Sequence, residues 1–465
     1  MTSNYSFPPG FVWGTATAAA QIEGATTEDN KSPSIWDTFA AKPGTTKDGL
    51  NPEVACDHYH LYKDDVALMA KLGIRHYRFS LAWTRLIPDG TGEINQAGFD
   101  YYNNLIDELI ANDITPWCTF YHWDLPQVLE DKGGWRERSI LDAFSSYAKI
   151  VVSTFGDRVK NWFTLNEIPG FIGHGYKLGL HAPGAKESSQ VVNQAFHHAM
   201  VCHGIAVKTV RDLGGPDARV GLVHNPEIIV PFIETPEHIE AAKAVFAQIN
   251  EHTLAPIYSG KYPDSYLERC GADAPRFTEE EMELISQPMD FLGLNVYRGH
   301  FVRVGADNKP EVLPLPKAFP RAEADWLNHV PQAMYWGLRF CHELYNPNEM
   351  LIAENGVGYH DAPGMPTTQE VIHGWTHPER DYDSEILDTH RCQYLRTYLQ
   401  SVHRAIEEGI PLTGYFLWSL IDNFEWADGY TSRFGIVHTD FKTQRRTPKL
   451  SASWYSEVIR HNAVL

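Results

Sequence analysis

The sequence predicts an α/β fold, a single (β/α)₈ barrel of the TIM type. Two observations lead to it. A helical stripe of apolar residues, a stop and a strand-like apolar run recur along the chain, and no two successive runs are joined by an obvious hairpin turn. Strands that alternate with helices form a parallel sheet, and eight of them can close into a barrel. We therefore expect residues 1–465 to form one domain.

The repeated unit can be followed through its helices. Residues 61–72 have apolar positions at roughly helical spacing and end at Gly73, directly before a strand-like run. Similar stripes occupy 105–110, 144–155 and 395–406, again before apolar runs. The eight expected strands are Phe11–Thr17, Ile74–Ser80, Ile114–Tyr121, Val159–Leu165, Arg219–His224, Met289–Val296, Met350–Glu354 and Leu412–Leu417.

A doubly wound open sheet is the alternative arrangement of such units. Nucleotide-binding folds of that kind place a G-x-G-x-x-G or phosphate-binding loop after the first strand, and this chain has none there. The proline-rich stretch 308–322 could mark a domain boundary. Because it is short and flanked by strand and helix signals, we interpret it as a surface loop between the sixth strand and its helix.

Composition argues against several classes of protein. The net charge of −20 opposes binding to nucleic acid or to an anionic membrane surface. The six cysteines include no C-x-x-C pair, so neither a disulfide scaffold nor a zinc site is indicated. The first residues lack a basic stretch followed by an apolar one, and no run of about 18 apolar residues occurs. We therefore expect a cytoplasmic location.

The ends of the expected strands carry the side chains suited to chemistry. In a (β/α)₈ barrel the active site lies at these carboxyl ends. Glu167 and Glu354 close apolar runs, where a buried carboxylate is costly unless it is paired or functional. A salt-bridged strand cap is the alternative for each. Other strand-end residues are Gln21, Glu23, Arg78, His122, Trp123, Asp124, Asn166, Asn225, Asn295, Tyr297, Asn355 and Trp418.

Several segments form a dense set of motifs along nearly the whole chain. They are WGTATAAAQIEG (13–24), SIWDTF (34–39), YRFSLAWTRLIPDG (77–90), FYHWDLPQ (120–127), TLNE (164–167), HAPG (181–184), LGLNVY (292–297), IAENG (352–356) and FLWSLIDNFEWADGY…RFGIVHTD (416–440). Together, and in this order, they resemble glycoside hydrolase family one, the β-glucosidase family. The family fold is a (β/α)₈ barrel, in agreement with the repeated unit.

The resemblance implies a retaining mechanism. Cleavage of a glycosidic bond needs a proton for the departing oxygen and a nucleophile at the anomeric carbon. By its place in TLNE, Glu167 is similar to the family's general acid/base, and by its place in IAENG, Glu354 is similar to the nucleophile. Arg78, Tyr297 and Asn295 are similar to residues that support the nucleophile.

The resemblance also implies a sugar-binding site that needs no metal and no cofactor. A pyranose requires many polar partners in a small space and flat apolar surfaces for its C–H face. The residues implied for substrate binding are Gln21, His122, Trp123, Asn166, Trp418, Glu425, Trp426 and Phe434, with Asn225 and Trp326 on the leaving-group side.

The chain departs from the family pattern next to the acid/base. The family usually reads N-E-P, whereas Glu167 is followed by Ile168 and only then by Pro169. This is where the chain turns toward the leaving-group side. The segment 359–384, after the expected nucleophile, also diverges and is expected to shape the entrance to the site.

The expected activity is that of a β-glucosidase, which hydrolyses terminal non-reducing β-D-glucosyl residues of cellobiose, short oligosaccharides or aryl and alkyl β-glucosides. A 6-phospho-β-glucosidase is the nearest alternative, but a carboxylate at Glu425 would repel the phosphate. A non-catalytic sugar-binding relative would lack one carboxylate, and both are present. A transglycosylating relative uses the same residues and stays open, as do galactose and fucose as the preferred sugar.

Overall fold

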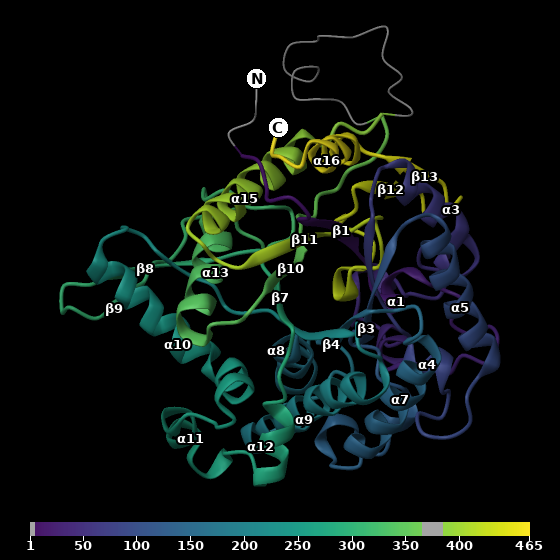
Figure 1. Ribbon diagram of the computed structural model, residues 1–465, viewed down its shortest axis with the longest axis horizontal. Coiled ribbons are helices and arrows are strands. Elements are labelled where there is room, and N and C mark those ends of the chain that lie inside the picture. The colour runs from purple at the N-terminus through teal and green to yellow at the C-terminus, as the bar shows by residue number, and fades with distance from the viewer. Residues whose placement is uncertain (1–4, 365–384) are drawn as a thin grey trace, which may run out of the picture.

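The computed structural model describes residues 5–364 and 385–465 and contains a closed barrel (Figure 1). Its parallel strands are hydrogen-bonded in the order β1-β11-β10-β7-β5-β4-β3-β2, so the first strand pairs with the last. Each strand overlaps an expected run, and the predicted fold is confirmed. The barrel strands are β1 (Val12–Ala16), β2 (His76–Ser80), β3 (Thr115–Tyr121), β4 (Asn161–Asn166), β5 (Arg219–His224), β7 (Phe291–Asn295), β10 (Met350–Asn355) and β11 (Leu412–Trp418).

Helices surround the barrel (Figure 1). In α7, Phe144, Tyr147, Val151 and Phe155 recur at helical spacing, and all are buried. The long helices are α3 (His58–Lys71), α5 (Gln96–Ala111), α7 (Ile140–Phe155), α9 (Ser189–Leu213), α10 (Pro236–Ser259), α13 (Gln332–Tyr345), α15 (Thr389–Glu407) and α16 (Leu450–His461). Within the described residues, no helix combines the length and apolar character needed to cross a bilayer.

Short helices occupy the loops between these elements. They are α1 (Ala19–Ile22), α2 (Ile35–Ala40), α4 (Trp83–Leu86), α6 (Gln127–Glu130), α8 (Ile168–Ile172), α11 (Asp264–Cys270), α12 (Glu279–Ile285), the 3₁₀ turns η1 (Lys47–Gly49), η2 (Gly134–Arg136), η4 (Gly271–Asp273) and η5 (Trp426–Asp428), and the π-helix η3 (Gly173–Leu178). Of the divergent segment 359–384, residues 365–384 lie outside the described residues. Its expected role at the entrance stays a prediction.

The expected surface loop at 308–322 is in part a strand, and this corrects the prediction. β9 (Pro310–Val312) pairs antiparallel with β8 (His300–Val304), which pairs in turn with β6 (Ile229–Pro231). Proline is tolerated here because β9 begins with it and forms the edge of this three-stranded sheet. Its proline content and exposed residues concealed the strand in the sequence.

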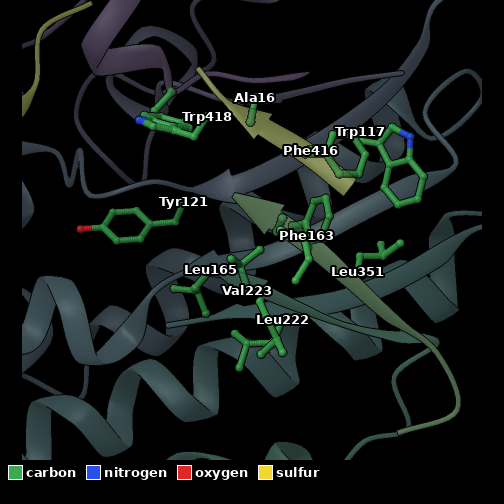
Figure 2. Packing of buried hydrophobic residues seen from close by; sticks show 14 of the residues in the cluster. Ala16, Trp117, Tyr121, Phe163, Leu165, Leu222, Val223, Leu351, Phe416 and Trp418 are labelled. Carbon is green, nitrogen blue, oxygen red and sulfur yellow. The ribbon is translucent and has the colours of Figure 1, made fainter. Parts of the chain in front are cut away.

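Aromatic rings fill part of the barrel interior. Trp117, Phe163, Phe291 and Phe416 come from four different strands. The ring centroid of Trp117 lies 5.2–5.8 Å from those of the other three, and the centroids of Phe163 and Phe291 lie 5.1 Å apart. Figure 2 shows the side chains of Trp117, Phe163 and Phe416 close together. A Cβ at Gly14 of β1 would lie 2.5 Å from the Phe416 ring, so this packing requires glycine there. The filled interior leaves the carboxyl ends of the strands as the place for a functional pocket.

Candidate active site

Glu354 lies on β10, buried and with fixed partners. Its Oε1 accepts a hydrogen bond of 2.6 Å from Nη1 of Arg78, and its Oε2 accepts one of 2.7 Å from the Tyr297 hydroxyl. The guanidinium of Arg78 is itself buried and lies 5.1 Å from the centre of the Phe163 ring. The pairing of β10 with β7 shifts register between Ile352 and Glu354, and such irregularities re-aim side chains at active sites. Two donors, one of them a cation, therefore hold both oxygens of this carboxyl in place.

Glu167 directly follows β4 and has a different environment. Its backbone is left-handed, with φ of 56°, and its N–H donates to the Val223 carbonyl at 2.9 Å. Its Oε1 accepts a hydrogen bond of 2.5 Å from Nδ2 of Asn295. Burial, together with the negative charge of Glu354, raises the pKa of Glu167 to about 8. At neutral pH this carboxyl is therefore mostly protonated.

The hydrogen bonds around His122 indicate which of its ring nitrogens carries the proton. Arg78 can only donate, and its Nη2 donates to Oδ1 of Asn166 at 2.7 Å. The amide nitrogen of Asn166 therefore faces Nε2 of His122, at 3.1 Å, and donates to it. His122 thus carries its proton on Nδ1. Burial and the nearby charge of Arg78 lower the pKa of His122 well below its usual range, so the ring is neutral.

Asn295 differs from the prediction. It was expected to support Glu354, but its Nδ2 donates to Glu167 and, at 3.2 Å, to Oδ1 of Asn166. The physical reason is that both oxygens of Glu354 already have donors in Arg78 and Tyr297, whereas Oε1 of Glu167 offers a free acceptor. Asn295 therefore contacts the expected acid/base and not the expected nucleophile.

The two glutamates open into a cavity of about 380 Å³. Gln21 and Arg78 reach its lining through hydrogen bonds to Glu425 and Glu354. The expected residues that line the cavity are His122, Trp123, Asn166, Glu167, Asn225, Asn295, Tyr297, Trp326, Glu354, Trp418, Glu425, Trp426 and Phe434. The lining residues that the sequence did not single out are His174, Leu180, His181, Pro226, Glu227, Arg298, Ala427 and Asp428.

The missed lining residues lie in the connections between strands and long helices, some of them in the short helices η3 and η5, where periodicity gives no signal. Several of them lie in or directly beside the motif segments. Arg298 directly follows Tyr297, His181 begins the HAPG segment, and Ala427 and Asp428 are part of the segment 416–440. Proximity to a motif segment was therefore the signal that could have identified these residues.

Several buried polar atoms of the pocket have no hydrogen-bond partner within the described residues. They are Oε1 of Gln21, Nδ1 of His122, and Oδ1 of Asn225 and Asn295. Nε2 of Gln21 donates to the Phe424 carbonyl at 2.9 Å, which leaves Oε1 as the unpaired acceptor. Buried polar atoms are normally bonded, so a group of unpaired ones in one pocket indicates a polar ligand. Among the described residues, no cluster of His, Cys, Asp and Glu could hold a metal ion.

Aromatic rings supply the apolar part of the pocket. Trp418 stacks with His122, with ring centroids 5.8 Å apart and planes at 22°. Trp426 stacks with Trp123 at 4.8 Å. The indole Nε1 of Trp123 donates to the Asn166 carbonyl at 2.9 Å, which fixes that ring. Flat faces beside unpaired polar atoms suit a sugar ring, with its C–H face and its hydroxyls.

A buried ionic network holds the loop that carries Glu425. Asp422 accepts from Nζ of Lys449 at 2.8 Å, from Nη1 of Arg433 at 3.0 Å and from the N–H of Gly435 at 3.0 Å. The same loop continues into β12 (Val437–Thr439), which pairs with β13 (Arg446–Pro448). Desolvation in the pocket, then the negative charges of Asp428 and Glu354, raise the pKa of Glu425 well above its usual range. Any anion placed beside Glu425 would meet the same negative charges.

Comparison with known proteins assigns the chain to a family. The model of glycosyl hydrolase family 1 matches residues 3–464. The chain belongs to glycosyl hydrolase family 1. Similar family 1 sequences are the 1,4-beta-D-glucan glucohydrolase of Thermotoga neapolitana, 43% identical over 98% of this chain and 99% of the relative, and beta-glucosidase A of Acetivibrio thermocellus, 41% identical over 99% of each. The family predicted from the motifs is thus confirmed.

Solved family 1 structures share the whole architecture. The family 1 β-glucosidase from Thermotoga maritima covers 100% of both chains, with a TM-score of 0.88 at 41% identity. The same enzyme in complex with deoxynojirimycin gives the same score and covers 99% of this chain and 100% of that one.

The structure accommodates the shifted proline that follows Glu167, where the chain departs from the family 1 pattern. Ile168 and Pro169 are the first two residues of α8, with Glu167 at its N-cap. A proline is tolerated in the first turn of a helix because the N–H groups there have no partner within the helix. Moving the proline by one place therefore still allows a helix to begin directly after Glu167.

Proposed function

We propose that this family 1 chain is a retaining β-glucosidase, a single catalytic domain over residues 1–465, with Glu354 as nucleophile and Glu167 as general acid/base. The observation that carries the proposal is the difference between these two carboxyls. Glu354 accepts hydrogen bonds from Arg78 and Tyr297, whereas the pKa of Glu167 is raised to about 8. Double displacement needs a nucleophilic carboxylate and a carboxyl that can donate a proton. The raised pKa of Glu167 suits the second task, and the two donors that orient Glu354 suit the first.

In the first step the Glu354 carboxylate attacks the anomeric carbon of a bound β-glucoside. Glu167 gives its proton to the departing oxygen, so the leaving group departs as an alcohol and a glycosyl ester of Glu354 forms. The negative charge of Glu354 disappears in this ester. Because that charge helps to raise the pKa of Glu167, its loss favours an ionised Glu167 at the stage where a base is needed.

In the second step Glu167 takes a proton from water, and the water oxygen attacks the anomeric carbon. The ester bond to Glu354 breaks, which releases the sugar and restores the carboxylate, while Glu167 is protonated again. Two inversions at one carbon give overall retention of configuration. An acceptor alcohol in place of water would give transglycosylation by the same route.

The unpaired polar atoms are suited to hold the terminal sugar. Nδ1–H of His122 would donate to one hydroxyl, and Oε1 of Gln21 would accept from another. Asn166 uses one of its two amide hydrogens on His122, and the other would donate to the 2-hydroxyl. Trp418 supplies the flat face beneath the ring. Hydrogen bonds that strengthen as the transition state forms would add to the rate.

A rate panel on the wild-type enzyme tests the proposed substrate class. We expect turnover of 4-nitrophenyl β-D-glucoside and of cellobiose, and a kcat/KM for 4-nitrophenyl 6-phospho-β-D-glucoside that is lower on the order of 10²-fold or more, because a phosphate would face the charges of Glu354 and Asp428. The rates on the corresponding galactoside and fucoside in the same panel show which terminal sugar the enzyme prefers. A preference for the phosphorylated substrate would overturn the assignment.

Glu425→Ser should weaken binding of the terminal sugar at its 4- and 6-hydroxyls. We expect kcat/KM for the glucoside to fall on the order of 10²-fold, and acceptance of the 6-phosphoglucoside to rise relative to it as the carboxyl is removed. Glu425→Gln is the matched control, because an amide resembles the protonated carboxyl and should lose less.

If Glu425 only caps its loop, its replacement should change the stability of the protein and not its choice of substrate. The melting temperature would then fall while the ratio of the two substrates stayed fixed. Rates on both substrates and the melting temperature of each variant therefore decide between binding and capping.

A further inference from the structure

One wall of the cavity carries an ion pair that the proposed mechanism does not use. Nη2 of Arg298 donates to Oε1 of Glu227 at 3.0 Å, and both residues line the cavity together with Trp326. Nη1 of Arg298 lies 3.4 Å from the Trp326 carbonyl and donates to it. Trp326 in turn stacks parallel to Phe434, at 6.3 Å and 16°. The pair thus lies beside Trp326, which the resemblance assigns to the leaving-group side.

Glu227 is held in place from two directions. The buried side chain of Asn250 on α10 accepts from the N–H of Glu227 at 3.0 Å and donates to its carbonyl at 3.1 Å. The carboxylate lies between Arg298 and Nε2 of His300, at 3.2 Å from the latter. The hydrogen bond with His300 and the charge of Arg298 lower the pKa of Glu227 to about 2, despite partial burial. Glu227 is therefore ionised throughout the working range of such an enzyme.

Arg298 is held just as firmly by its chain neighbours. The carbonyl of Tyr297 accepts from the hydroxyls of Tyr394 and Tyr398, at 3.0 and 2.9 Å. The N–H of Gly299 donates to Asn328 at 3.3 Å. A guanidinium has five N–H donors, more than its bonds to Glu227 and Trp326 use. Arg298 is thus a positioned cation with donors to spare.

The rest of this wall is polar as well. His174 and His181 line it with their ring centroids 4.9 Å apart, and Nδ1 of each is buried without a hydrogen-bond partner in the described part of the chain. Oδ1 of Asn225 is unpaired too. Burial lowers the pKa of His181 to about 3, so its imidazole is neutral. Such a wall matches a ligand with several hydroxyls better than a flat apolar one.

We propose that Arg298, positioned by Glu227, is the residue that selects sugar leaving groups: its guanidinium donates to hydroxyls of the reducing-end glucosyl unit of a β-linked disaccharide while it holds Trp326 in place beside that unit. The inference rests on the proposed β-glucosidase function and deepens it by naming the leaving-group class. It assigns Glu227 a positioning role, because the carboxylate orients the guanidinium and does not itself reach the reacting atoms.

The test compares two substrates that share the terminal sugar. For Arg298→Met we expect the ratio of kcat/KM on cellobiose to kcat/KM on 4-nitrophenyl β-D-glucoside to fall about 10-fold, as one hydrogen bond to a charged group is lost. Glu227→Gln should lower the same ratio by about 3-fold, since the guanidinium stays but is held less firmly. Transfer of the glycosyl group from the enzyme to added glucose, relative to its transfer to water, should also fall, and it should fall more in Arg298→Met than in Glu227→Gln.

Glu311→Gln is the matched control. It breaks the ion pair with Arg303, at 2.8 Å and of similar exposure, on the neighbouring β8–β9 hairpin, and neither residue lines the cavity. We expect no change in the substrate ratio. An unchanged ratio in Arg298→Met or, should that variant not fold, in Glu227→Gln would overturn the proposal, as would equal loss on both substrates with a lower melting temperature. A wild-type enzyme inactive on both substrates would instead contradict the proposed function.

Discussion

Replacing Glu354 by alanine should lower kcat on β-glucosides by on the order of 10⁴-fold or more, because no glycosyl ester can form. Added azide or formate should then restore part of the activity, since the small anion fits the space left by the carboxylate and can accept hydrogen bonds from Arg78 and Tyr297. The rescued product should have inverted configuration, because a single displacement occurs. Product analysis by NMR measures this directly.

Glu354→Gln is the control for the rescue. The amide fills the space of the carboxyl and leaves no room for the anion, so azide should restore much less activity. Near wild-type rates in Glu354→Ala, or a rescued product with retained configuration, would remove Glu354 from the role of nucleophile.

Replacing Glu167 by alanine should divide substrates by their leaving groups. Rates on cellobiose should fall about 10²–10⁴-fold, the usual contribution of general acid catalysis. The glycosylation step on a dinitrophenyl glucoside should change far less, because that leaving group departs without a proton. Single-turnover kinetics separates this step from the slowed hydrolysis of the intermediate.

The pH profile gives an independent measure of Glu167. The pKa of Glu167 is raised to about 8, and only the protonated form acts as the acid, so wild-type kcat/KM should fall as the pH rises through that value. In Glu167→Ala this basic limb should disappear. Equal loss on both kinds of leaving group with an unmoved basic limb would make Glu167 a structural cap.

The barrel could be predicted because its signal is local. Most residues of the barrel strands are buried, and four of the strands follow a helical stripe of apolar residues that is visible in the sequence. The sheet β6–β8–β9 could not be predicted in this way. Its strands at Ile229–Pro231 and Pro310–Val312 are only three residues long, and β9 is exposed, so neither length nor alternation marks them.

The site could be predicted as far as motifs reach. The motif segments identify Glu167, Glu354 and most of the residues expected to bind the substrate, and these residues line the same pocket. Asn295 donates to Glu167, whereas Arg78 and Tyr297 donate to the two oxygens of Glu354. This division of hydrogen bonds cannot be read from the spacing of residues in the sequence.

The ion pair at the leaving-group wall was hidden for a similar reason. Arg298 and Glu227 lie 71 positions apart in the chain and meet between two strand pairings, β5 with β7 and β6 with β8. Their loops are placed by tertiary contacts such as that of Asn250 with the Glu227 backbone.

Covalent trapping tests the central claim most directly. A 2-deoxy-2-fluoro-β-D-glucoside with a dinitrophenyl leaving group reacts through the first step, but the fluorine slows hydrolysis of the ester, so the intermediate accumulates. We predict that the intact mass rises by one fluoroglucosyl group per chain and that peptide mapping places this group on Glu354. An adduct on another residue, or turnover of β-glucosides with inversion and no adduct, would contradict the account.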